Sequence, residues 1–146
     1  LVDAMVLLAG MYTLGLGVPS NEREAVYLLT KAAEKGDATA QYNLGLRYPL
    51  PSDSAISLKW FHKAAEQGYA KAYDHLGFSY QVGHGIPQDY VEAFKWYLLA
   101  SLEGEEADFM MLGVSLRDRM KGLKSQMTQE QIAEAQKLAY EWKPKK

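Results

Sequence analysis

Apolar residues recur at helical spacing along the chain, in paired stripes. Starting at Ala72, an alanine, a leucine and a tyrosine stand at positions i, i+4 and i+8, the last being Tyr80. This spacing places the three side chains on one face of an α-helix. After a short polar segment a second stripe follows, formed by Ala93, Trp96 and Ala100. The pattern predicts two helices joined by a turn. The tryptophans that this spacing places in the core are Trp60, Trp96 and Trp142.

The two-helix unit recurs along the chain. Ala72 and Leu76 have counterparts 68 positions earlier, at Ala4 and Leu8, and a third copy starts at Ala40. A repeat of this length indicates stacked units that share a continuous core. We expect an all-α fold in a single repeat domain over 1–146. Its copies are expected at about 4–38, 39–70 and 71–106, with a degenerate capping copy at 107–143.

Residue types at the expected helix boundaries agree with this division. Each second helix follows a residue whose side-chain oxygen can cap free backbone amides. These residues are Asn21, Asp53, Asp89 and Thr128. Glu24 and Glu92 stand three residues after their caps, at the spacing of a capping box. Glycine favours the left-handed conformation that ends a helix, and the glycines expected there are Gly36, Gly68 and Gly104.

The fourth copy departs from the pattern. Its Leu112 and Gly113 lie 36 positions after the matching pair of the third copy, but its tyrosine and its Gly-x-Gly are missing. We expect Arg117–Met127 to be a long loop and a last helix to run from about Gln129 to Trp142. The basic run in that loop is of a kind that is usually solvated, although it also suits an acidic partner or lipid headgroups. The copy should cap the array, because an exposed end would leave an apolar face in water.

The turn Gly83-His84-Gly85 has a second interpretation, because a Gly-x-Gly before a helix can hold a phosphate. A phosphate-binding loop of that kind normally follows a strand, whereas a helix precedes these glycines. The second copy replaces the motif with Pro49-Leu50-Pro51-Ser52 and still fits the repeat. We therefore expect the glycines to be turn residues, since positive φ costs glycine little.

Composition excludes several function classes. The 146 residues carry a formal net charge of −2, whereas a nucleic-acid binder would be expected to have a strongly basic face. The chain contains no cysteine, which excludes disulfides, thiolate metal sites and a cysteine nucleophile. The uncharged stretch Ala4–Val18 is shorter than the roughly 18 residues that span a bilayer, and no basic segment marks it as a signal peptide. The compartment, exported or cytoplasmic, and the existence of upstream repeats stay open.

No cluster of residues points to catalysis or to a bound cofactor. The histidines are His62, His75 and His84, and no two of them stand at a spacing typical of metal ligands. We interpret them as surface or interface residues and expect neither a metal nor another cofactor. The carboxylates fall mainly at helix starts and turns, where they favour the positive end of the helix dipole.

The segment Ala72–Gly104, AYDHLGFSYQVGHGIPQDYVEAFKWYLLASLEG, resembles a Sel-1-like repeat of bacterial type, a branch of the tetratricopeptide superfamily. About a dozen of its positions recur at fixed spacing, and the likeness extends back to Ala4. The resemblance implies a right-handed α/α solenoid whose first helices line a concave surface. It also implies a role in holding proteins together. Some cysteine-rich relatives are linked to β-lactam binding, but this chain has neither their cysteines nor a Ser-x-x-Lys motif.

The same resemblance indicates where a partner would lie. In tetratricopeptide-like arrays the first helices face the groove, so positions two and six after the anchor alanine should point into it. The expected partner-binding residues are Val6, Tyr42, Leu46, Asp74, Phe78, Met110 and Val114. This mostly apolar row, with Arg47 and Gln81 at its rim, suits an amphipathic helix or an extended peptide. The alternative is that superhelical curvature buries the row as a seam between neighbouring first helices.

The sequence thus favours a non-enzymatic scaffold that binds a protein or peptide partner on its concave face. A narrower alternative is an immunity or inhibitor protein that neutralises a secreted toxin or lipase effector. A β-lactam-binding or hydrolase-type enzyme is a third hypothesis, and it would need a clustered nucleophile and base that the sequence does not show. Neither nucleic acid, nor a metal, nor an integral membrane segment is expected to take part.

Overall fold

The computed structural model describes residues 1–48, 52–83, 86–103 and 114–145. The secondary-structure elements in these ranges are eight α-helices. They are α1 (Val2–Leu14), α2 (Glu22–Glu34), α3 (Ala38–Gly45), α4 (Ser54–Glu66), α5 (Lys71–Val82), α6 (Tyr90–Leu102), α7 (Leu116–Lys124) and α8 (Gln129–Glu141). No helix among them is long and apolar enough to cross a membrane.

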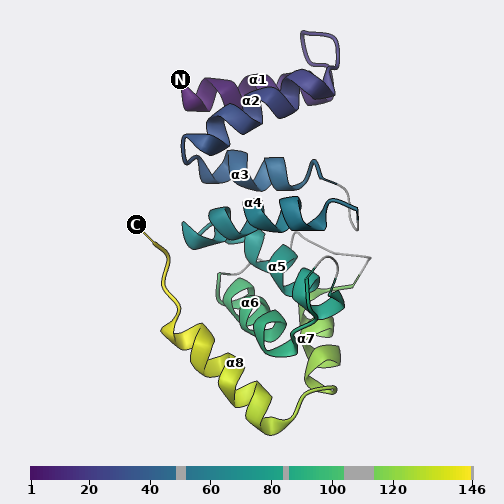
Figure 1. Cartoon of the computed structure of the whole chain (residues 1–146), viewed down its shortest axis with the longest axis vertical. Helices are drawn as coiled ribbons and strands as arrows, with labels where there is room; N and C mark the ends of the chain where they lie inside the picture. Colours follow the sequence, from purple (N-terminus) through teal and green to yellow (C-terminus); the bar gives the residue numbers. More distant parts are fainter. Residues whose placement is uncertain (49–51, 84–85, 104–113, 146) are drawn as a thin grey trace.

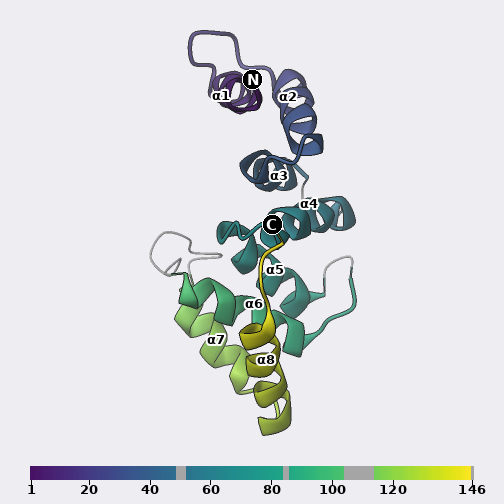
Figure 2. The same ribbon diagram turned by 90° about the vertical axis from the view of Figure 1, so that its left-hand side faces the viewer.

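The helices stack along the long axis of the molecule in chain order (Figure 1). α1 and α2 form one end, and α7 and α8 lie near the other end with α6 (Figure 1, Figure 2). In Figure 2, α1 and α3 lie on one side of the stack and α2 and α4 on the other. Each helix from α1 to α6 packs against the next, and α8 returns to pack against α6. The expected all-α superhelix of stacked helix pairs is confirmed.

Small side chains bring the stacked helices together. The alanines of the repeat pattern that have no exposed surface are Ala25, Ala32, Ala40, Ala64, Ala72, Ala93 and Ala100. Trp60 and Trp96 are buried beside them, as their spacing predicts. Trp142 is half-buried, with its ring centroid 5.6 Å from that of Trp96. The core therefore combines close helix contacts with large rings that fill the remaining space.

The helix ends follow the expected chemistry. The side chains of Asn21 and Asp89 accept hydrogen bonds from the backbone amides three residues on, at 3.2 and 3.0 Å. Asp53 is the N-cap of α4 without a side-chain cap bond, and Thr128 forms a complete capping box with Gln131. The described glycines with positive φ, all in turns or at helix ends, are Gly15, Gly17, Gly36, Gly68 and Gly83. Gly85 and Gly104, for which the same role is expected, lie outside the described residues.

One element differs from the sequence prediction. The segment Arg117–Met127, expected as a loop, forms most of the helix α7. Ser115 caps this helix by accepting a hydrogen bond from the amide of Asp118 at 3.2 Å. Leu116 and Leu123, seven residues apart, are buried against the core, so an apolar stripe holds the helix in place. The charged residues between them do not prevent a helix when one face is anchored in this way.

Candidate functional site

The structure divides the expected row on the first helices into exposed and buried members. Leu46 and Val114 are exposed, with 46% and 40% of their surface accessible. Val6 of α1 and Phe78 of α5 are half-buried. Met110 lies outside the described residues. The accessible members of the row are all apolar.

Tyr42 of α3 is only 8% exposed and packs inside the stack. Its ring centroid lies 5.7 Å from that of Phe61 and 5.2 Å from that of Tyr69. Its hydroxyl oxygen lies 3.2 Å from Nε2 of His75, whose ring stacks on Phe61 at 4.6 Å. Tyr42 therefore joins the second repeat to the third.

Asp74 of α5 is 3% exposed and pairs with the buried guanidinium of Arg119 on α7. Arg119 donates two parallel hydrogen bonds to the carboxylate, from Nη1 to Oδ1 at 2.5 Å and from Nη2 to Oδ2 at 2.9 Å. The guanidinium also lies over the ring of Tyr97, 5.2 Å from its centroid. The pair fixes α7 to α5. Sequence reasoning missed Arg119 because 45 positions separate the two partners.

The row thus has two kinds of surroundings. Tyr42 and Asp74 make the contacts of a buried seam, as in the alternative interpretation of the sequence. Leu46 and Val114 lie at an open surface. A role in partner binding stays a prediction for all of the residues expected to have one.

A small cavity opens between α1 and α3, beside the exposed part of the row. Its volume is about 190 Å³. Its walls are formed by Val6, Ala9, Gly10, Thr13, Leu14, Leu29, Asn43 and Arg47. A Cβ atom placed on Gly10 would have no neighbouring atom within 4 Å, so the space beside this glycine is open. The sequence pattern singled out Val6 and Arg47 but missed Thr13 and Asn43, which belong to no repeated motif.

Arg47 gives this cavity a charged edge. Its Nη2 donates a hydrogen bond to Oγ1 of Thr13 at 3.3 Å, which ties α3 to α1. Its Nη1 lies 3.6 Å from a carboxylate oxygen of Glu22 on α2. About 29% of the Arg47 side chain stays exposed, so the guanidinium remains within reach of a ligand.

The two described histidines lie in aromatic contacts between helices. Nε2 of His62 is 3.1 Å from the hydroxyl of Tyr80. Burial lowers the pKa of His75 to about 4, with a further contribution from the charge of Arg119, and burial also lowers the pKa of His62. Both imidazoles are therefore neutral at pH 7. In the described ranges, no three His, Asp or Glu side chains are grouped so as to hold a metal ion.

Comparison with known proteins identifies the repeats. The family model of the Sel1 repeat matches three consecutive segments, residues 2–37, 38–69 and 70–105. The chain belongs to the Sel1 repeat family. The resemblance seen in the sequence is thereby confirmed, and Sel1 repeats are generally protein-interaction modules and typically non-catalytic. A search of curated proteins gives no match.

Solved structures similar to this Sel1 repeat chain include the following two. A Sel1 repeat protein from Oxalobacter formigenes shares 38% identity with a TM-score of 0.67, over 72% of this chain and 45% of its own length. A protective antigen present in uropathogenic Escherichia coli strains, which displays an SLR fold, shares 28% identity with a TM-score of 0.44, over 94% of this chain and 37% of its own. The chain thus spans less than half the length of either protein.

Proposed function

We propose that this Sel1 repeat chain is a non-enzymatic interaction module that binds a protein or peptide partner on the face of α1, α3 and α5. The observation that carries the proposal is the accessible apolar surface on these first helices. Leu46 is 46% exposed, and Val6 and Phe78 keep part of their surface accessible. A solvated helix face normally carries polar side chains at such positions. Covering these side chains with a partner removes apolar surface from water, which favours association.

The cavity between α1 and α3 supplies the specificity that an apolar face alone would lack. Val6, Gly10 and Leu14 form an apolar wall that can receive a side chain of the partner. Arg47 stands at the edge of the same cavity and can donate hydrogen bonds to a carbonyl or carboxylate group. An apolar recess with a few well-placed polar groups is the usual composition of a binding site.

The surface is formed before the partner arrives. α3 packs against both α2 and α4, so the helix that Leu46 caps is held on two sides. A rigid surface loses little conformational entropy on binding, and this lowers the free-energy cost of association. The stack therefore suits a scaffold whose partner adapts to it.

A pull-down from source-cell extract, read by mass spectrometry, tests the proposal. The wild-type chain is compared with a Leu46→Glu/Phe78→Glu variant. A carboxylate in an apolar contact loses its hydration without compensation, so we expect recovery of the specific partner to fall by at least about tenfold. Tyr42 is left unchanged, because a charge at this buried position would disturb the fold instead of the surface.

Ile56→Glu is the matched control. Ile56 is 43% exposed and lies on α4, the second helix of the repeat that contains Leu46. This variant should retain the partner, and all three proteins should show the same thermal melt by circular dichroism. The proposal is wrong if the double variant retains the partner, or if Ile56→Glu loses it to the same extent.

A further inference from the structure

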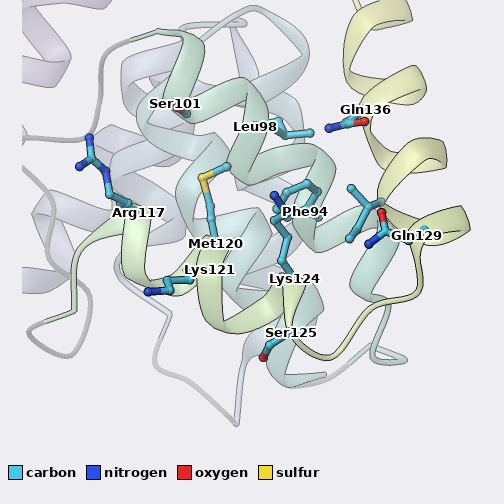
Figure 3. A pocket seen from close by; sticks show the side chains of 11 residues that line it. Phe94, Leu98, Ser101, Arg117, Met120, Lys121, Lys124, Ser125, Gln129 and Gln136 are labelled. Atoms are coloured by element: carbon cyan, nitrogen blue, oxygen red, sulfur yellow. The ribbon is translucent and has the colours of Figure 1, made fainter.

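A larger groove lies at the opposite end of the stack from α1, between α7 and α8 (Figure 3). Its volume is about 610 Å³. α7 and α8 both pack against α6, which forms the floor of the groove through Phe94 and Leu98. Met120 extends from α7 into the space between the helices, as Figure 3 shows, and Ile132 adds an apolar surface from α8. The bottom of the groove is therefore apolar.

One wall of this groove is basic. Arg117, Lys121 and Lys124 stand at positions i, i+4 and i+7 of α7, so their side chains share one face of the helix. The opposite wall contributes the uncharged Gln129 and Gln136 of α8. Among the described residues that line the groove, none is acidic. Lys121 and Lys124 thus place two positive charges on a wall that faces an uncharged one, in a chain whose net charge is −2.

We propose that this basic groove, which is separate from the face of the first helices, binds an acidic peptide segment of a partner protein. Apolar side chains of the peptide cover Met120 and Leu98, and its carboxylates lie toward Lys121 and Lys124. Complementary charge steers such a segment to the groove and fixes its orientation. The seven-residue spacing from Arg117 to Lys124 spans about 10 Å of helix, so the groove accommodates roughly two turns of a bound helix.

The shape of the groove favours a peptide over other anionic ligands. A lipid surface is flat, whereas the apolar floor here lies between two helices. A nucleic-acid strand would meet three cations on one wall and a chain that is negative overall, and it would need a more extended basic surface. A short peptide with both acidic and apolar side chains matches both features of the groove.

Peptide selection tests this proposal. A phage-displayed library of random 12-residue peptides is selected on the wild-type chain and counter-selected on a Lys121→Glu/Lys124→Glu variant. We expect enriched peptides to carry several Asp or Glu residues beside apolar residues spaced three or four apart. In fluorescence anisotropy, the best labelled peptide should bind the double Glu variant at least about tenfold more weakly than wild type, and Lys121→Gln/Lys124→Gln should fall between them. Met120→Ala should weaken binding several-fold through the apolar floor.

The control is Lys35→Glu/Lys137→Glu, which changes the net charge equally at two exposed sites outside the groove. It should bind the peptide as wild type does, and every lysine variant should melt at the wild-type temperature, since the substituted lysines are exposed. The proposal is overturned if selection yields no acidic peptide, or if both charge-reversed pairs weaken binding equally. It is also overturned if Met120→Ala has no effect. Displacement of the peptide by phosphatidylglycerol vesicles or by a single-stranded RNA oligomer would assign the groove to those ligands instead.

Discussion

The residue that follows the repeated leucine in each first helix depends on the side chain that faces it. In the second repeat this residue is Gly45, and a Cβ placed there would lie 2.9 Å from Cε1 of Phe61. In the third it is Gly77, where a Cβ would collide with the ring of Tyr97. The aromatic ring thus requires a glycine opposite it. The sequence showed the glycine as part of a motif, but the reason for it appears only in the packing.

In the first repeat, a larger residue replaces the glycine and a smaller side chain replaces the aromatic ring. Its counterpart of the glycine is Ala9, which is 1% exposed, and the counterpart of the ring is Leu29. We expect Gly77→Ala to lower the free energy of unfolding by about 1–3 kcal/mol, because overpacking outweighs the higher helix propensity of alanine. In a Tyr97→Leu background, which recreates the pair of the first repeat, the same substitution should be nearly neutral.

Urea denaturation of the four proteins in this cycle measures the coupling. Gly10→Ala is the control, because a Cβ at Gly10 meets no atom within 4 Å and the substitution should leave stability equal or slightly higher. Equal costs of Gly77→Ala with tyrosine and with leucine at position 97 would show that the ring is not the cause.

His75 makes the stability of the fold depend on pH. Burial and the charge of Arg119 lower its pKa to about 4 from an ordinary value of 6.5. Between these values the unfolded chain binds a proton that the folded chain does not, so stability falls as the pH falls from about 6.5 to about 4. The loss from this residue is at most about 3 kcal/mol. Urea midpoints between pH 7 and about pH 4.5 should decrease more for wild type than for His75→Gln. Parallel decreases in the two proteins would assign the pH dependence to other groups, such as His62.

At the scale of the elements, helices with repeated stripes and side-chain caps could be predicted from the sequence. Asn21, Asp89 and Thr128 start their helices as expected. α7 was missed because its charged residues and Gly122 were interpreted as a loop. Two local signals for it were present, namely the cap Ser115 and the apolar stripe that includes Leu116. The pairing of Arg119 with the distant Asp74 also holds α7 in place, but it cannot be recognised from the local sequence.

The anchoring of α7 on α5 gives a testable prediction. Arg119→Met leaves the carboxylate of Asp74 buried without its partner, and we expect it to cost about 3–5 kcal/mol of stability. Replacing both residues, as Asp74→Leu/Arg119→Met, should recover most of this loss, because no uncompensated charge remains. Urea denaturation measures both changes. A loss below about 1 kcal/mol for Arg119→Met alone would mean that the pair does not stabilise the contact.

At the scale of the whole molecule, the superhelix was predictable, and the division of its first-helix face was not. A repeat pattern treats Tyr42 and Leu46 as equivalent members of one row. The structure separates them because His75 and Phe61 pack around Tyr42, whereas Leu46 stays accessible. These contacts involve residues from other helices, so periodicity within one helix cannot reveal them. The basic run of α7 was visible in the sequence, but the apolar floor that α6 and α8 place beside it was not, for the same reason.

Site-specific photocrosslinking tests most directly whether the first helices bind the partner. A photoreactive phenylalanine analogue replaces Leu46 in one protein and Ile56 in another, at positions of nearly equal exposure, 46% and 43%, on two helices of one repeat. Both proteins are irradiated in source-cell extract, and the adducts are identified by mass spectrometry. We predict that a specific partner is linked from position 46 and not from position 56. Linkage from position 56 alone would contradict the account, because the partner would then contact the second helices.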